Sequence, residues 1–145
     1  MIEQLFSFRG RSSRLRYWRI ELLCVALIAA VTCAGYFAIL SIGPMGGAIF
    51  VGMVPIVVMS LAATLRRLHD RGKDLRRMLL FQGVLFLCRG LAHEMVASGT
   101  MVAQAASAPL SLVSIGVGIW SFVEIGCLRG QPEPNRFGEA PAPGR

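Results

Sequence analysis

Two long stretches of this sequence carry almost no charge, and this restricts the chain to a small class of folds. Between Glu21 and Arg66 there is no Asp, Glu, Lys or Arg. A helix needs about 20 predominantly apolar residues to cross a bilayer. Only 16% of the 145 residues are charged, whereas soluble domains carry about 25%. The sequence therefore predicts a membrane protein.

Four apolar stretches are long enough to span a bilayer, which predicts an all-α integral membrane bundle of four transmembrane helices. We place the spans at about residues 20–42, 46–65, 78–97 and 108–128. The first two are separated only by GPMGG, which is short enough to require an antiparallel helical hairpin. An N-terminal segment lies along the membrane interface. Residues 1–128 then form a single domain, and the Pro- and Gly-rich stretch 129–145 is a flexible cytoplasmic tail.

The basic residues gather in three segments, and these predict the orientation. Residues 1–19, 66–77 and 129–145 hold five, six and three of the 15 Lys and Arg residues. Four spans place all three segments on one side, and the positive-inside rule assigns that side, with both termini, to the cytoplasm. In so apolar a chain, a net charge of +7 indicates contact with anionic lipid rather than nucleic acid.

Three short motifs lie in the three basic segments. They read FRGRSSRLRYW at 8–18, RRLHDRGK at 66–73 and PNRFG at 134–138. Together they resemble the signatures F-x-G-R-x-x-R-x-x-Y-W, R-R-L-H-D-x-G-[KR] and P-N-x-[FY]-G of the bacterial inner-membrane family called domain of unknown function 805. The resemblance covers nearly the whole chain. It implies a small multi-pass helical protein of the inner membrane and no established activity. DLRR after Gly72, and Arg89 in the third span, depart from the family pattern.

Because the motifs share the cytoplasmic side, we expect them to fold together as one cap over the inner end of the bundle. The arginines should pair with Asp70, Glu21 and Glu124, and the Asn135 amide should hydrogen-bond into the same layer. The aromatic residues favour the headgroup region of the membrane. The residues predicted to form the cap or to contact lipid headgroups are Arg9, Arg11, Arg14, Tyr17, Trp18, Arg66, Arg67, His69, Asp70 and Asn135.

Polar residues also occur inside the predicted spans. Gln82, Arg89 and His93 are spaced to share one face of the third helix, and Glu124 lies about one turn from the cytoplasmic end of the fourth. One interpretation is a polar path through the bundle, and another is that Arg89 snorkels outward and pairs with Glu94. Glu124 could bond Gln82 or an arginine of the cap. Small residues along the fourth span favour close helix packing, within the bundle or between subunits.

These features favour a structural or interaction role at the membrane, with anionic lipids, another membrane protein or a second copy of the chain as partner. A small transporter using the polar face of the third helix is the alternative. A lipid-acting enzyme using His69 and Asp70 is a third hypothesis. No catalytic residue, metal site, cofactor or nucleic-acid partner is predicted, because one histidine with one carboxylate supplies too few ligands and the four cysteines are dispersed.

Overall fold

The computed structural model describes residues 3–141, and every regular element in that range is a helix. Three stretches are long and apolar enough to cross a membrane, namely Arg14–Asp70, Leu75–Ala97 and Met101–Cys127. The all-helical, membrane-type architecture is thereby confirmed. The elements in chain order are α1 (Glu3–Phe6), α2 (Arg14–Ile42), the 3-10 helix η1 (Gly43–Gly52), α3 (Met53–Asp70), α4 (Leu75–Ala97), α5 (Met101–Ser121) and the π-helix η2 (Phe122–Cys127).

The chain divides into two compact units, whereas the sequence predicted a single domain. The first unit comprises Met1–Gly72 together with Gly130–Arg145, and the second comprises Lys73–Arg129. The described part of the C-terminal stretch therefore belongs to the first unit and is held there by specific contacts. The flexible tail stays a prediction, although its described residues make hydrogen bonds within the first unit that composition gave no sign of.

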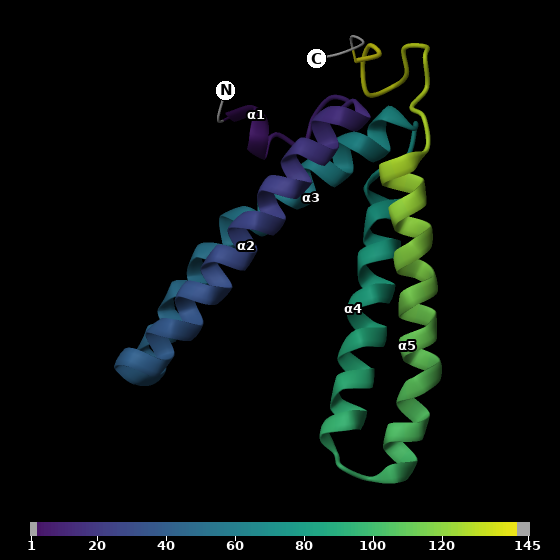
Figure 1. Cartoon of the computed structure of the whole chain (residues 1–145). Helices are drawn as coiled ribbons and strands as arrows, with labels where there is room; N and C mark the ends of the chain where they lie inside the picture. Colours follow the sequence, from purple (N-terminus) through teal and green to yellow (C-terminus); the bar gives the residue numbers. More distant parts are fainter. Residues whose placement is uncertain (1–2, 142–145) are drawn as a thin grey trace. The chain divides into compact units, whose positions relative to one another are not determined.

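The first unit is a helical hairpin in which α2 packs antiparallel against α3 (Figure 1). Pairs across the hairpin follow opposite directions along the chain: the Ser60 hydroxyl donates to Glu21 at 3.0 Å, and Cys24 Sγ contacts the Ile56 carbonyl at 3.8 Å. A Cβ at Gly35 would lie 2.7 Å from the Phe50 ring, so the absence of a side chain lets that ring pack against α2. The core of the hairpin consists of Ile20, Cys24, Ile56, Met59 and Ala63.

The helix boundaries differ from the predicted spans because capping decides where a helix begins. The Ser13 hydroxyl accepts from the Arg16 N–H at 3.4 Å, so α2 begins at Arg14 rather than near residue 20. Much of the segment predicted to lie along the interface is therefore the first part of α2. The returning arm begins as the 3-10 helix η1, which packs antiparallel along α2: a Cβ at Gly46 would overlap the Ala38 backbone, and the Phe50 ring packs against Gly35. Pro55 lies in the first turn of α3, where its missing N–H removes no hydrogen bond.

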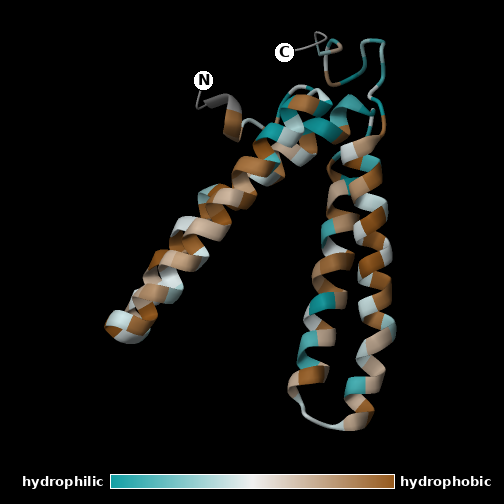
Figure 2. Cartoon of the chain, in the orientation of Figure 1, coloured by the Kyte–Doolittle hydropathy of each residue, from teal (hydrophilic) through white to brown (hydrophobic). Residues whose placement is uncertain are grey.

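The second unit pairs α4 with α5 and η2 as an antiparallel hairpin (Figure 1). The Thr100 hydroxyl accepts from the Ala103 N–H at 3.3 Å and starts α5 earlier than the predicted residue 108. At the other end, the Leu128 N–H donates to the Val123 carbonyl at 3.1 Å, a π-type bond. Coloured by hydropathy, the first unit is hydrophilic mainly at the end distant from its hairpin turn, whereas the second unit also carries hydrophilic residues on α4 and α5 in the half near its turn (Figure 2).

Candidate functional site

Arg11 connects three parts of the first unit that are far apart in the sequence. Its Nε donates to the Asp70 carboxylate at 3.0 Å. Its terminal nitrogens donate to the backbone carbonyls of Glu133 at 2.8 Å, Gly138 at 3.3 Å and Gln131. The side chain is only 1% exposed, so the five donors of the guanidinium are directed almost entirely at protein acceptors. Arg11 thereby ties the N-terminal segment to α3 and to the tail.

Asp70 ends α3 and is 4% exposed. One carboxylate oxygen is 2.9 Å from the Arg11 guanidinium, and the other accepts from Arg67, which is 1% exposed. Arg67 also donates to the Ser12 carbonyl at 3.4 Å. A buried carboxylate is tolerated when paired charges and hydrogen bonds satisfy both of its oxygens. Asp70 is thus the acid that two of the predicted cap arginines share.

The third motif, PNRFG, folds as a tight turn. Asn135 and Gly138 exchange backbone hydrogen bonds of 3.1 and 2.9 Å. The Asn135 side-chain oxygen accepts from the Phe137 N–H at 2.9 Å, a pattern that Asn favours because its short amide can bond its own backbone. The turn presents one amide and one aromatic ring to the rest of the unit.

Both groups of this turn contact His69. The Asn135 amide donates to the His69 carbonyl at 2.9 Å, and the Phe137 ring stacks on the imidazole at 3.9 Å with 7° between the planes. His69 Nδ1 faces the Gly10 carbonyl at 3.1 Å, which places the ring proton on that nitrogen. His69 therefore acts as a bridge between the first and third motifs. We refer to these contacting residues as the Asp70 junction: Arg11, Arg67, His69, Asp70, Asn135 and Phe137.

Two glycines allow the chain to close around this junction. Gly72 has φ +71°, and a Cβ there would lie 2.9 Å from the Gln131 amide, so an L side chain is disfavoured by both conformation and space. A Cβ at Gly130 would overlap the Asp70 carboxylate. The Gln131 N–H, next in the chain, donates to the Asp70 carbonyl at 2.9 Å. The tail can approach this closely only because residue 130 has no side chain.

We expect Gly130→Ala to displace the tail from the Asp70 junction. Overpacking of this kind costs about 1–3 kcal/mol, so trypsin should cleave after Arg136 several-fold faster than in the wild type. Gly90→Ala is the matched control, because a Cβ at Gly90 meets nothing within 4 Å and alanine favours a helix. Equal cleavage rates in wild type and Gly130→Ala would show that the tail is not held by this close approach.

The other predicted cap residues surround the junction without forming its centre. Arg66 is 4% exposed, and its Nε bonds the Ala62 carbonyl at 3.2 Å. Arg9 and Arg14 are exposed, whereas Tyr17 and Trp18 are half-buried and meet edge to face at 5.5 Å.

Glu21 was expected to pair with an arginine. In the described part of the chain, its carboxylate instead accepts from hydroxyls of the neighbouring helix, Ser60 at 3.0 Å and Thr64 at 3.4 Å. Just beyond α3, burial lowers the pKa of the Arg71 guanidinium, and the adjacent Asp70 carboxylate opposes that shift by favouring the charged form.

Glu124 forms a second cluster, in the second unit. It lies in η2 and is 4% exposed. Its carboxylate accepts from Trp120 Nε1 at 2.9 Å, forms an ion pair with Lys73 and lies 3.9 Å from Arg77. The exposed Gln82, one partner that the sequence suggested, does not bond to it. The Arg77 guanidinium lies 5.3 Å from the centres of the Phe81 and Trp120 rings. We call Lys73, Arg77, Phe81, Trp120 and Glu124 the Glu124 cluster.

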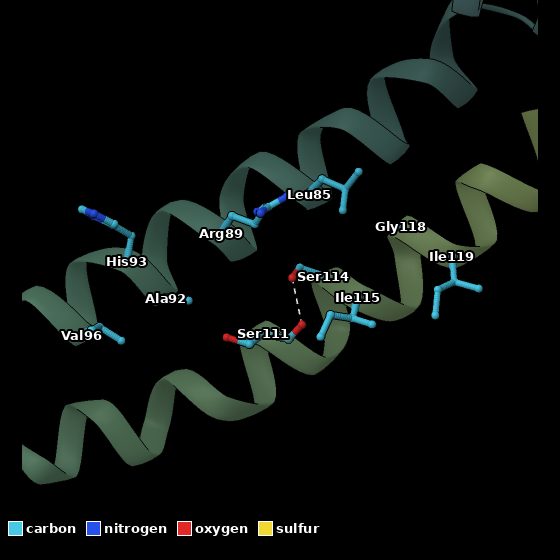
Figure 3. A pocket seen from close by; sticks show the side chains of 10 residues that line it. All are labelled: Leu85, Arg89, Ala92, His93, Val96, Ser111, Ser114, Ile115, Gly118 and Ile119. Carbon is cyan, nitrogen blue, oxygen red and sulfur yellow. Dashed lines mark hydrogen bonds between the residues drawn. The ribbon is translucent and has the colours of Figure 1, made fainter. Parts of the chain in front are cut away.

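A groove of about 690 Å³ runs between α4 and α5 (Figure 3). Arg89 and His93 line it, but Gln82 does not, so the three polar residues predicted to share a path do not line one groove. His93 lies 3.9 Å from Glu94, both being largely exposed. We call this feature the Arg89 groove, and it is lined by Leu85, Arg89, Ala92, His93, Val96, Ser111, Ser114, Ile115, Gly118 and Ile119.

Comparison with known proteins identifies the family. A family model described as "Protein of unknown function (DUF805)" matches residues 5–139. The chain belongs to the DUF805 family. The assignment suggested by the three motifs is therefore confirmed. No curated protein and no solved structure matches this DUF805 chain.

The DUF805 motifs have a structural explanation, since all three contribute to the Asp70 junction. Sequence reasoning anticipated a meeting of Arg11, Arg67, Asp70 and Asn135, but missed two contacts. The hydrogen bonds from Arg11 to backbone carbonyls of the tail have no sequence signal, because any residue can supply a carbonyl. The stacking of Phe137 on His69 could have been sought from the aromatic residue in PNRFG. Lys73, Arg77 and Trp120 were also missed as partners of Glu124.

Proposed function

We propose that this DUF805 protein is a multi-pass protein of the bacterial inner membrane whose basic cytoplasmic end binds anionic lipid headgroups. The observation that carries the proposal is a division among the arginines. Arg11, Arg66 and Arg67 are buried and directed at protein acceptors. A second group is exposed and suited to contact a charged surface, and it consists of Arg9, Arg19, Arg76 and Arg129.

In the proposed topology, the four spans are α2, η1 with α3, α4, and α5 with η2. Supporting this topology, α2 and α4 have 29 and 23 residues, and either is sufficient to cross a bilayer core of about 30 Å at 1.5 Å per residue. The reversals at 43–47 and 98–100 contain no charged residue. The chain passes between the two units at 72–73 and 129–130, where its basic residues concentrate. The positive-inside rule then assigns that end to the cytoplasm.

Buried and exposed arginines differ in how strongly they attract an anionic membrane, for an energetic reason. An exposed Lys or Arg close to an anionic membrane surface contributes about 1 kcal/mol of attraction. A buried arginine paired with a carboxylate contributes little to that attraction, because its charge is compensated locally. The Asp70 junction would hold the N-terminal segment, which carries Arg9, and the tail in fixed positions against α3.

A test compares lipid selectivity of the purified protein in vesicles of phosphatidylcholine with a minority of phosphatidylglycerol. With spin-labelled lipids, we expect the protein to immobilise more phosphatidylglycerol than phosphatidylcholine. The excess should shrink at 0.5 M salt, since the Debye length falls to a few Å. The quadruple variant Arg9→Gln/Arg19→Gln/Arg76→Gln/Arg129→Gln should lose most of the selectivity.

The control is the double variant Glu133→Gln/Glu139→Gln, which removes negative rather than positive charges. Both carboxylates are exposed on the tail, and their removal should maintain or increase the selectivity. If the quadruple variant kept the wild-type preference for phosphatidylglycerol, the exposed arginines would not be the lipid-binding groups, and a protein partner would be the better assignment for this surface.

A further inference from the structure

Arg89 places a full positive charge in a groove that is otherwise mainly apolar. The groove walls carry Leu85, Val96, Ile115 and Ile119. The nearby serine hydroxyls already donate to their own helix, Ser114 to the Ser111 carbonyl at 2.8 Å and Ser111 to the Ser107 carbonyl at 3.0 Å. Arg89 is therefore the strongest donor that the groove offers to a ligand.

The described part of the chain gives Arg89 no counter-charge. None of the described residues forms a hydrogen bond or ion pair with it. Glu94, the partner suggested by the sequence, lies near His93 instead. The other spans cannot supply a carboxylate at this depth, because residues 22–69 contain no Asp or Glu. An arginine near the middle of a spanning helix costs about 2.5–3.5 kcal/mol on translocon scales, so an anion from outside the chain would be favoured.

The direction of the side chain argues against simple snorkelling. At 1.5 Å per residue, Arg89 lies about 12 Å from the end of α4 at Ala97 and about 21 Å from its start. The nearer interface is therefore the one beyond Ala97. Figure 3 shows the Arg89 side chain extending along α4 toward Leu85, away from that end, as expected for helical side chains, which tilt toward the N-terminus.

We infer that the Arg89 groove binds an acidic amphiphile from the bilayer, with its anionic headgroup on the Arg89 guanidinium and its acyl chain along the apolar walls. The inference rests on the membrane embedding proposed above but not on lipid binding by the basic end. The volume of about 690 Å³ lies within the range of about 300–1,000 Å³ typical of ligand sites. The groove is bounded by two helices of one hairpin, so an amphiphile could enter sideways from the lipid.

The test uses the full chain in nanodiscs of phosphatidylcholine, which carry no net charge, and every protein compared also carries the quadruple substitution Arg9→Gln/Arg19→Gln/Arg76→Gln/Arg129→Gln, so that the basic end does not attract the added anion. Binding of hexadecanoate is compared with methyl hexadecanoate and acetate. Hexadecanoate should bind best, and its affinity should fall at least about tenfold in Arg89→Leu, because a charge-assisted contact contributes about 1.5–3 kcal/mol. Arg89→Lys, which keeps the charge, should retain more of the affinity than Arg89→Leu.

A matched pair of variants tests the groove itself. Gly118→Leu places a side chain in the groove, whereas Gly116→Leu adds the same side chain two residues away at a position where a Cβ meets nothing within 4 Å. Only Gly118→Leu should weaken binding of hexadecanoate.

The inference would be overturned by undiminished binding in Arg89→Leu, by equal binding of the methyl ester, or by equal loss in both glycine variants. Competition by acetate as strong as by hexadecanoate would likewise overturn it, because the chain would then contribute nothing. If Arg89→Leu instead converted a dimer to a monomer without changing hexadecanoate binding, the groove would be an interface between copies. Failure of the chain to enter nanodiscs would contradict the proposed membrane embedding itself.

Discussion

Replacing Asp70 with asparagine should release both the N-terminal segment and the tail from α3. The carboxylate pairs with Arg11 and Arg67, whose side chains are each 1% exposed, and an amide would direct a donor at one of these guanidinium groups. Breaking a buried charge pair by removing one partner costs about 3–5 kcal/mol. We expect a lower thermal midpoint in detergent and cleavage by trypsin after Arg11 at least about tenfold faster.

The control for this change is Glu139→Gln. Glu139 is an exposed acid in the same unit, and its neutralisation should alter stability by less than about 0.5 kcal/mol. If trypsin cut Asp70→Asn and wild type after Arg11 at the same rate, the Asp70 junction would not be what holds the N-terminal segment. An asparagine variant that melts early while its two terminal segments stay protected would contradict the same conclusion.

Glu124→Gln should weaken the junction between α4 and the end of α5. The carboxylate is 4% exposed and binds Trp120, Lys73 and Arg77. The two cations are each about a third exposed, so water screens part of the loss. The expected cost is about 1.5–3 kcal/mol, typical of hydrogen bonds to charged groups. In a Trp18→Phe background, Trp120 is the only tryptophan, and its emission reports the melting of this cluster directly.

Glu94→Gln provides the comparison for Glu124. Glu94 lies on α4 of the same unit but is 82% exposed, so its loss should leave the Trp120 transition within error of the wild type. A Glu124→Gln transition that coincides with the wild-type transition would show that the π-helical end of α5 is held by apolar packing alone. Both predictions probe buried acids whose partners come from distant parts of the sequence.

Local signals predicted the helical content well, and misplaced its limits in a consistent way. Hydropathy located the apolar middle of each helix, but α2 and α5 begin at the capping residues Ser13 and Thr100, which precede the apolar stretches. The GPMGG turn was predicted from its glycines, but the sequence did not show that the returning arm begins as the 3-10 helix η1. Hydropathy locates the residues that are apolar enough to lie in the bilayer. The start of a helix depends instead on which side chain accepts hydrogen bonds from the first backbone N–H groups, and that side chain is usually polar.

The cap residues were predicted only in part. Placing three motifs on one side of a membrane made a meeting of Arg11, Asp70 and Asn135 reasonable, because the number of spans restricts where each motif can lie. Glu21 was expected to pair with an arginine, whereas in the described part of the chain its carboxylate accepts from Ser60 and Thr64 on the packed helix. Charge suggests which residues could pair, but helix register determines which ones meet.

By itself, the sequence determined that this chain forms long apolar helices, gathers its basic residues in three segments and belongs to the DUF805 family. These properties are local, because hydropathy and charge are carried by neighbouring residues. Only the tertiary structure decided that Arg11 donates hydrogen bonds to the tail and that Phe137 stacks on His69. It likewise decided that Glu124 pairs with Lys73 and that Arg89 lines a groove. Each of these contacts joins residues from separate segments, and their geometry depends on how the helices pack rather than on what any one segment prefers.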